Sequence, residues 1–219
     1  MSNEPTGFLY PFIEGDERDA GGLVLDLASS AQAKMAASRA LTGETLDLSE
    51  PMLGAAARAM ADRFRHGGRL FAFGNGGSAT DAEGAVELFR SPHCGRPLPA
   101  LSLVDDRAVL TALANDVGFD LVFSRQLIAH ARSGDIAMGF STSGDSVNVL
   151  RAFAEAAGRG LLTVGLAGYD GGGMAACDHV GHCLVVRSDS VHRIQEAQAA
   201  LVLRLWTVIQ DCLAEGTRL

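Results

Sequence analysis

Short apolar runs alternate with amphipathic stretches along most of this chain. Five of the apolar runs have the length of a buried strand, and they cover residues 69–73, 98–104, 135–140, 161–167 and 183–186. Helical patterns lie between or after them, at residues 78–90, 107–114, 119–131, 146–157, 173–177 and 190–214. Apolar strands that alternate with helices are typical of a parallel sheet covered on both faces. The pattern therefore predicts an α/β fold, a three-layer α-β-α sandwich around a parallel sheet.

The first 68 residues precede this alternation and contain two helical patterns. Residues 22–40 form an alanine-rich amphipathic stretch, and Ser49-Glu50-Pro51 is a typical start for a second helix that Gly67-Gly68 ends. Residues 1–20 combine prolines and glycines with an acidic run at 14–19 and an apolar patch at 8–13. We expect an irregular N-terminal segment over residues 1–20 and a single domain over 21–219. The apolar patch either packs loosely on its own domain or docks a protein partner.

Two of the predicted strands end in turns that suit an anion. One runs into Gly74-Asn75-Gly76-Gly77-Ser78 and the other into Ser141-Thr142-Ser143-Gly144-Asp145-Ser146, and a helix follows each. Glycines let the backbone approach an anion closely, and the free N–H groups of a helix start point at it. Four hydroxyls within six residues exceed the single one that a helix cap requires. Because ligands bind at the carboxyl ends of parallel strands, the two turns predict one site for a phosphorylated ligand.

The composition limits the kind of partner and the compartment. At 219 residues the chain is long enough for one core, and its formal net charge of −8 argues against a nucleic-acid or anionic-membrane surface. Its four cysteines are scattered without a Cys-x-x-Cys pair, so we expect neither a zinc nor a disulfide framework. The sequence contains no recognisable signal peptide and no uninterrupted apolar run of about eighteen residues. We therefore expect a cytoplasmic protein that binds phosphate through amides and hydroxyls.

The glycine turn lacks the signature of a nucleotide-binding loop. No Gly-Lys-Ser/Thr follows it, which argues against a Walker A loop. The dinucleotide fingerprint Gly-x-Gly-x-x-Gly is met at Gly74 and Gly76, whereas Ala79 occupies the third glycine position. Nucleotide binding is therefore the weakest of the functions that a phosphate site allows.

With these motifs, the chain resembles the sugar isomerase (SIS) domain family and, within it, the phosphoheptose isomerase branch. The matching segments keep their order and approximate spacing, and they are Phe73-Gly74-Asn75-Gly76-Gly77-Ser78, Ala114-Asn115-Asp116-Val117-Gly118-Phe119, Ser141-Thr142-Ser143-Gly144-Asp145-Ser146, Gly168-Tyr169-Asp170-Gly171-Gly172 and Arg193-Ile194-Gln195-Glu196. The resemblance implies a five-stranded parallel sheet, a homotetramer and the binding of phosphorylated sugars such as sedoheptulose 7-phosphate.

The same resemblance assigns substrate-binding roles to individual residues. Ser141, Ser143 and Ser146, with Thr142 between them, would hold the phosphate. Gln195 falls on a position that in active isomerases contacts the substrate or a zinc ion. The residues implied to line the sugar are Asn75, Gly76, Gly77, Ser78, Asn115 and Asp116.

The resemblance breaks at the positions that carry the chemistry. Aldose–ketose isomerisation requires a base that moves a proton between neighbouring carbons and a group that polarises the carbonyl. The active isomerases have a His and a Glu four residues apart on the helix after the glycine turn, and a further His on the terminal helix. The corresponding positions here are Gly84, Leu88 and Leu203, none of which can bind zinc or carry a proton. Since Gln195 alone would not retain zinc, we expect no metal or other cofactor.

Two functions compete for this combination of motifs. The favoured one is a non-catalytic or regulatory phosphosugar-binding protein, similar to the catalytically silent branch of the family that associates with the bacterial replication initiator, whose partner does not carry over. The alternative is an active isomerase of the sedoheptulose 7-phosphate type, in which Glu87 is the base and His192 or Gln195 assists. Glu83 and Glu87 keep an i, i+4 spacing one position from the lost pair, so a small rotation of the helix would bring Glu87 inward. The simpler interpretation leaves both carboxylates on an exposed or subunit-facing surface.

Overall fold

The computed structural model describes residues 20–215, and helices and strands alternate over most of that range. The strands are β1 (Leu70–Gly74), β2 (Ala100–Ser102), β3 (Ile136–Ser141), β4 (Leu162–Gly168) and β5 (His182–Val186). The helices are α1 (Ala20–Arg65), α2 (Gly77–Arg90), α3 (Arg107–Asp116), the short 3-10 helix η2 (Phe119–Leu121), α4 (Val122–His130), α5 (Val147–Gly158), α6 (Gly172–Ala176) and α7 (Val191–Glu215).

The five strands form one sheet in the order β2-β1-β3-β4-β5, and every neighbouring pair is parallel. This confirms the predicted α/β fold with a five-stranded parallel sheet. Four strands match their predicted ranges to within one residue at every end, whereas β2 covers only three of the seven residues from 98 to 104. Pro99 lacks a backbone N–H and leaves only its carbonyl, which accepts from the N–H of Leu70, so the ladder begins after it.

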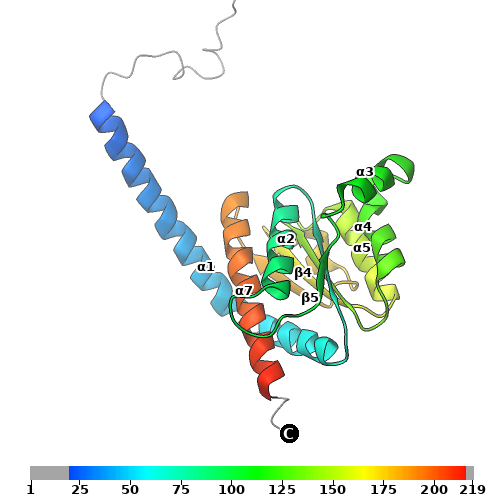
Figure 1. Cartoon of the computed structure of the whole chain (residues 1–219). Coiled ribbons are helices and arrows are strands. Elements are labelled where there is room, and N and C mark those ends of the chain that lie inside the picture. The colour runs from blue at the N-terminus through cyan, green and yellow to red at the C-terminus, as the bar shows by residue number, and fades with distance from the viewer. Residues whose placement is uncertain (1–19, 216–219) are drawn as a thin grey trace, which may run out of the picture. The chain divides into compact units, whose positions relative to one another are not determined.

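Helices cover both faces of the sheet, as Figure 1 shows for α2 and α7 on one side and α4 and α5 on the other. One apolar core joins α2, α7 and the later part of α1 to the sheet, and Phe89, Leu201 and Leu205 in it are fully buried. The second core joins α4 and α5 to the opposite face, around Phe73 and Phe153. The predicted three-layer sandwich is therefore confirmed.

The first helix differs from the prediction of two separate helices. α1 is continuous from Ala20 to Arg65 with Pro51 inside it, although a proline within a helix costs about 3 kcal/mol. The residues between the two predicted helices include Leu41 and Leu46, which pack against the core and favour helix there. The chain forms two compact units, divided after Arg39, and the described side chains of the first unit are nearly all exposed. The predicted segment 1–20, with its apolar patch at 8–13, lies outside the described residues apart from Ala20.

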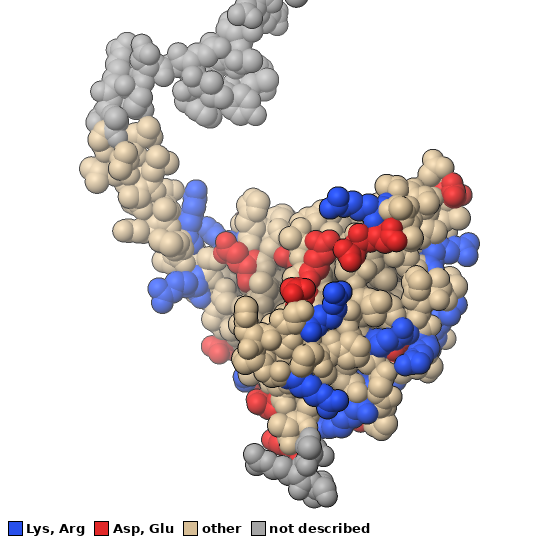
Figure 2. Space-filling model, viewed as in Figure 1, with Lys and Arg blue, Asp and Glu red and all other residues tan. Residues whose placement is uncertain are grey.

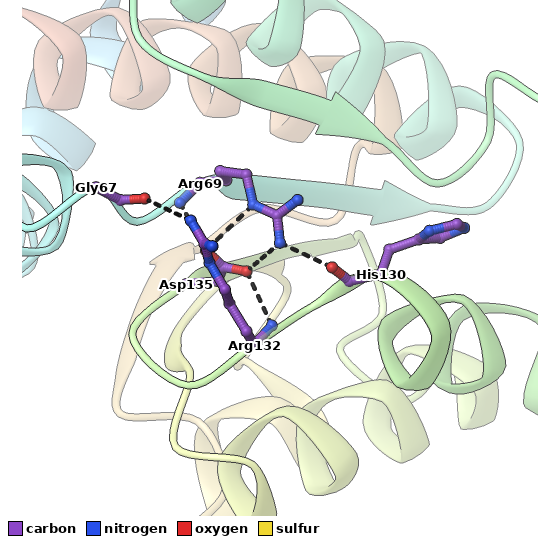
Figure 3. A network of polar contacts seen from close by, with 5 residues as sticks. All are labelled: Gly67, Arg69, His130, Arg132 and Asp135. Atoms are coloured by element: carbon purple, nitrogen blue, oxygen red, sulfur yellow. Dashed lines mark hydrogen bonds and ion pairs between the residues drawn. The ribbon is translucent and has the colours of Figure 1, made fainter.

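A buried carboxylate joins the beginnings of β1 and β3, at the edge of the sheet opposite the glycine and serine turns (Figure 3). The backbone N–H of Arg69 donates to Asp135 Oδ1 over 2.8 Å, and the Arg69 guanidinium donates to Oδ2 over 2.8 Å. The N–H of Arg132 also donates to Oδ2, over 2.9 Å, and the Arg69 guanidinium reaches the carbonyl of His130. Both carboxylate oxygens of Asp135 thus accept hydrogen bonds, and they link the residues before β1 to those before β3.

Candidate functional site

Three serine hydroxyls meet in the turn between β3 and α5, and we call Ser141, Ser143 and Ser146 the serine cradle. The Ser141 Oγ lies 3.0 Å from the Ser146 Oγ and 3.3 Å from the Ser143 Oγ. Ser146 occupies the N-cap position of α5, yet its side chain does not cap the helix. The hydroxyl is instead turned toward Ser141, so the first N–H groups of α5 keep no side-chain partner from the cap. Thr142 lies in the same turn and is half-buried.

The shape of the serine cradle depends on a glycine. Gly144 has a φ of 73°, and a Cβ there would lie 2.1 Å from the carbonyl oxygen of Gly171. Only glycine allows the serine turn to approach the β4–α6 loop this closely. The N–H of Gly173 then donates to Asp145 Oδ1 over 2.7 Å, which fastens the loop to the turn. The β4–α6 loop thus forms one wall beside the cradle.

The glycine turn after β1 lies next to the serine cradle. β1 and β3 pair in parallel with Gly74 opposite Phe140, so both turns leave the same edge of the sheet. The Asn75 amide donates to Asn148 Oδ1 over 2.8 Å, and the Asn148 amide donates back to Asn75 Oδ1 over 2.9 Å. Asn148 is buried in the first turn of α5, two residues after Ser146. The reciprocal amide pair therefore holds the two turns together.

Gln195 covers the glycine turn from the first turns of α7. A Cβ added at Gly77 would lie 2.5 Å from the Gln195 amide nitrogen, so this side chain occupies the space above the glycine. The same nitrogen donates to Asp81 Oδ2 over 2.8 Å. Burial raises the pKa of Asp81 above its usual range, and the hydrogen bond from Gln195 lowers it by a smaller amount. The pair Asp81–Gln195 is thus a polar bridge between α2 and α7, beside the glycine turn.

A small cavity opens next to this bridge, between α2 and α7. It has a volume of about 230 Å³ and is lined by Thr80, Asp81, Gly84, Ala85, Leu88, Phe140, Ala199 and Val202. Gly84 stands in the middle of α2, and a Cβ there would meet no atom within 4 Å. We call this space the α2–α7 cavity.

The residues around this cavity do not suit the zinc ion that the family resemblance implies. Gly84 and Leu88 line it without offering a ligand atom, and Leu203 on α7 is a 56% exposed apolar side chain. Zinc in proteins is held by three or four nitrogen, sulfur or oxygen ligands. Within residues 20–215, no group of three or more His, Cys, Asp or Glu side chains is arranged to hold a metal ion. The side chains at this position therefore do not fit zinc.

Glu87 and His192, the residues that an active isomerase would use, are both exposed. Glu87 is exposed on α2 and lines a second cavity with Glu83, Ser102 and Asp105. This cavity shares Thr80 and Gly84 with the α2–α7 cavity. Figure 2 shows acidic side chains gathered over the region of α2 on the face drawn there. His192 is exposed at the beginning of α7.

Asn115 and Asp116 lie at the C-terminal end of α3, where both are exposed. The Asn115 amide donates to Asp116 Oδ1 over 2.8 Å, so these side chains bond to each other and not to either turn. Of the expected substrate-binding residues, the structure therefore brings together Asn75, the glycine turn, the serine cradle and Gln195. Within the described residues, no hydrogen bond links Asn115 or Asp116 to that group.

Two residues of the site did not emerge from the sequence. Asn148 interrupts the apolar positions of α5, and a buried polar side chain at such a position signals a specific partner. Asp81 lies one turn after Gly77, which is the spacing that places two residues on one side of a helix. Both signals are local and become meaningful only when α5 and α7 are placed beside the glycine turn.

The arrangement can bind a phosphoryl group without a cationic side chain. Three hydroxyls and the N-terminus of α5 converge on one point, and hydroxyl donors with helix-start amides favour an anion there. Polar amides of Asn75 and Gln195 continue the surface toward the α2–α7 cavity. The geometry therefore fits a phosphate with a polar body attached to it.

Comparison with known proteins identifies similar chains. The SIS domain model matches residues 35–168. A phosphoheptose isomerase of Roseiflexus sp. is 40% identical over 175 residues, which cover 78% of this chain and 87% of the relative. The solved structure of a phosphoheptose isomerase from Neisseria gonorrhoeae has a TM-score of 0.77 and 36% identity, and the match covers 84% of this chain and 99% of the other. One from Francisella tularensis has a TM-score of 0.78 and 30% identity, over 84% of this chain and 98% of the other.

Proposed function

Because this chain belongs to the SIS-domain family, in its phosphoheptose isomerase branch, we propose that it binds a phosphorylated sugar and does not catalyse zinc-dependent isomerisation. The phosphate would sit in the serine cradle and the sugar would lie along Asn75 and Gln195. Such a protein acts as a sensor, carrier or regulatory subunit whose output depends on ligand occupancy.

The observation that carries the binding half of the proposal is the meeting of three serine hydroxyls at the start of α5. Ser146 contacts Ser141 over 3.0 Å instead of capping its helix, which leaves the helix start available to an anion. The reciprocal amide pair of Asn75 and Asn148 fixes the neighbouring turn without any ligand. A site preorganised in this way loses little conformational entropy when the ligand binds.

The second half of the proposal, that the protein does not catalyse isomerisation, rests on the side chains that would lie beside the bound sugar. Moving a proton between neighbouring carbons needs a base within hydrogen-bond reach of the substrate. At the positions where the family's active members have His, Glu and His, this chain has Gly84, Leu88 and Leu203. The residues that remain, Asp81 and Gln195, hydrogen-bond to each other. We infer that the ligand is bound and released unchanged.

The competing function is an isomerase that uses Glu87 as the base with His192 or Gln195. It requires Glu87 to leave the cavity that it shares with Glu83 and Asp105, on the exposed side of α2. His192 would also have to turn inward from an exposed position. The names of the relatives favour this alternative, whereas the positions of its side chains do not.

Calorimetric titration with sedoheptulose 7-phosphate, alongside NMR detection of its conversion, tests both halves. We expect saturable binding that the double variant Ser141→Ala with Ser143→Ala weakens by at least tenfold, since two hydroxyls worth about 1 kcal/mol each are lost. Ser133→Ala, an exposed serine at the opposite edge of the sheet, is the matched control and should bind normally. Conversion of the sugar, with or without added zinc, that disappears in Glu87→Gln would establish the isomerase instead. Absence of any binding would end the proposal.

We also propose that the protein is a homotetramer, as the family resemblance implies. The first half of α1 carries Leu25, Leu27 and Met35, which are 72%, 60% and 60% exposed. A helix with apolar side chains exposed to water is stabilised when a second copy covers them. Sedimentation equilibrium of the full chain measures the assembly, and a monomer at micromolar concentration would contradict this part.

We also propose that residues 1–20 dock a protein partner. Deletion of this segment tests the proposal, and we expect the truncated chain to remain a folded oligomer.

A further inference from the structure

The α2–α7 cavity has a buried apolar floor and a polar rim. Phe140, Ala85 and Val202 are 0%, 2% and 5% exposed and form the floor. Thr80 and Gly84 are exposed at the mouth, and the half-buried Asp81 lies beside them. The volume of about 230 Å³ is below the roughly 300–1,000 Å³ of sites that hold a whole small molecule. The cavity therefore suits one substituent of a ligand.

An unbroken series of contacts leads from this cavity to the serine cradle. Asp81 lines the cavity and accepts from Gln195, which lies over Gly77. The glycine turn continues into Asn75, whose amide pair with Asn148 reaches the start of α5. A ligand whose phosphate occupies the cradle would extend along these amides, and its far end would lie at the mouth of the cavity.

The chemistry of the walls identifies the substituent. We propose that the α2–α7 cavity binds the N-acyl group of an acylated amino-sugar phosphate, with the amide N–H donating to Asp81 and the acyl methyl buried against Val202. This inference rests on the proposed phosphosugar site and names the class of sugar that the site selects. A hydroxyl-only sugar would leave the apolar floor facing water or unfilled, whereas an acyl group covers it.

Gly84 supplies a second, independent reason. A glycine in the interior of a helix is less stable than alanine by about 0.5–1 kcal/mol, so it usually serves a close approach or a positive φ. Gly84 has neither, because a Cβ there would meet nothing within 4 Å. Gly84 lines the mouth of this cavity and also the neighbouring cavity beside Glu87, so the glycine leaves the space between the two open.

The test compares acylated sugars with their parents on the full chain. N-acetylglucosamine 6-phosphate and N-acetylmannosamine 6-phosphate are titrated beside glucose 6-phosphate and mannose 6-phosphate, and the N-propionyl analogues follow. We expect at least one acetamido sugar to bind about tenfold more tightly than its parent, because a buried methyl group contributes about fourfold and the amide hydrogen bond adds to it. The added methylene of the propionyl group should tighten binding about fourfold more.

Variants that fill the cavity complete the design. Gly84→Leu should abolish the preference, so that the variant binds the acetamido sugar and its parent with equal affinity. Ala199→Leu repeats this from the opposite wall in case the first variant does not fold, and Gly43→Leu is the control, since a Cβ at Gly43 also meets nothing within 4 Å.

The outcomes separate this inference from the proposed function. Acetamido and parent sugars of equal affinity, or an acetamido preference that both cavity-filling variants retain, would overturn the N-acyl subsite. Binding of sedoheptulose 7-phosphate without binding of any acetamido sugar would overturn it and leave the proposed function intact. Binding of none of these phosphates would reject both.

Discussion

Gln198 is the one side chain in the described residues whose buried polar atoms have no hydrogen-bond partner in the structure. It is 0% exposed on α7, one turn from Ile194 and Leu201, which are also fully buried. Its Oε1 and Nε2 thus face the core that α7 shares with the sheet. We predict that Gln198→Met stabilises the protein, because methionine keeps the unbranched shape and removes both polar groups.

The size of the effect follows from the cost of leaving a polar group unpaired. A buried donor or acceptor without a partner costs about 1–3 kcal/mol, and Gln198 has one of each. Methionine and glutamine lose similar side-chain entropy on burial, so that contribution cancels. The expected gain is therefore about 2–6 kcal/mol, or about 1–3 kcal/mol if a buried water serves one of the two atoms.

Gln126 provides the matched control with the opposite sign. It is 6% exposed on α4, and its amide donates to the carbonyls of Leu103 and Val122 over 2.9 and 3.1 Å. Gln126→Met removes these bonds and should destabilise the protein by about 1–3 kcal/mol. Urea unfolding at two protein concentrations measures both changes and separates them from assembly. If Gln198→Met destabilises as much as Gln126→Met, the Gln198 amide is hydrogen-bonded in solution and the prediction is wrong.

Three further predictions address other parts of the molecule. Gly84→Ala should raise the free energy of unfolding by about 0.5–1 kcal/mol in the same assay, because the helix gains a Cβ in open space, and a loss would show that the space is filled. Asp135→Ala should lower the free energy of unfolding by about 3 kcal/mol. This is the lower end of the range for breaking a buried ion pair, because 29% of the Arg69 side chain is exposed to water. The midpoint temperature of thermal unfolding should fall by roughly 6–12 °C. The pKa of Asp81 is raised in the folded state, so ionisation of this carboxyl disfavours folding. Its contribution to the free energy of unfolding therefore falls as the pH rises above 3.8, the ordinary pKa of an aspartate. Asp81→Asn should therefore be more stable than the parent at pH 7 and equal to it near pH 3, measured by urea unfolding; a constant difference across this range would contradict the pKa shift.

Much of the fold was predictable because its elements obey local rules. Each strand from β1 to β5 is a short apolar run, and periodic burial identifies α2 and α5 directly. The continuity of α1 through Pro51 was missed because the proline signal is local, whereas the packing of Leu41 and Leu46 that favours helix there depends on distant residues. Local signals therefore identify the elements, and tertiary packing decides where they end.

The candidate site likewise combines residues that local sequence signals identify with residues whose roles depend on tertiary packing. The serine cradle and the glycine turn lie within single turns, so their residues could be found from spacing alone. Asn148 and Asp81 acquire roles only through partners 73 and 114 residues away, at Asn75 and Gln195. The α2–α7 cavity is a property of two helices packed together, which no window of sequence contains.

Recognition and chemistry are carried by different elements in this fold, and that separation explains how one can change without the other. The serine cradle lies between β3 and α5, held by backbone geometry at Gly144 and by the Asn75–Asn148 pair. The positions to which the family resemblance assigns catalytic side chains lie on α2 and α7. Gly84 and Leu88 line the cavity between those helices, and Gly84 also lines the neighbouring cavity beside Glu87. Substitution there adds no buried charge and removes no hydrogen bond from the cradle. Under the proposed function, the sugar-phosphate site persists without the catalytic side chains, and the space between α2 and α7 is available to a different part of the ligand.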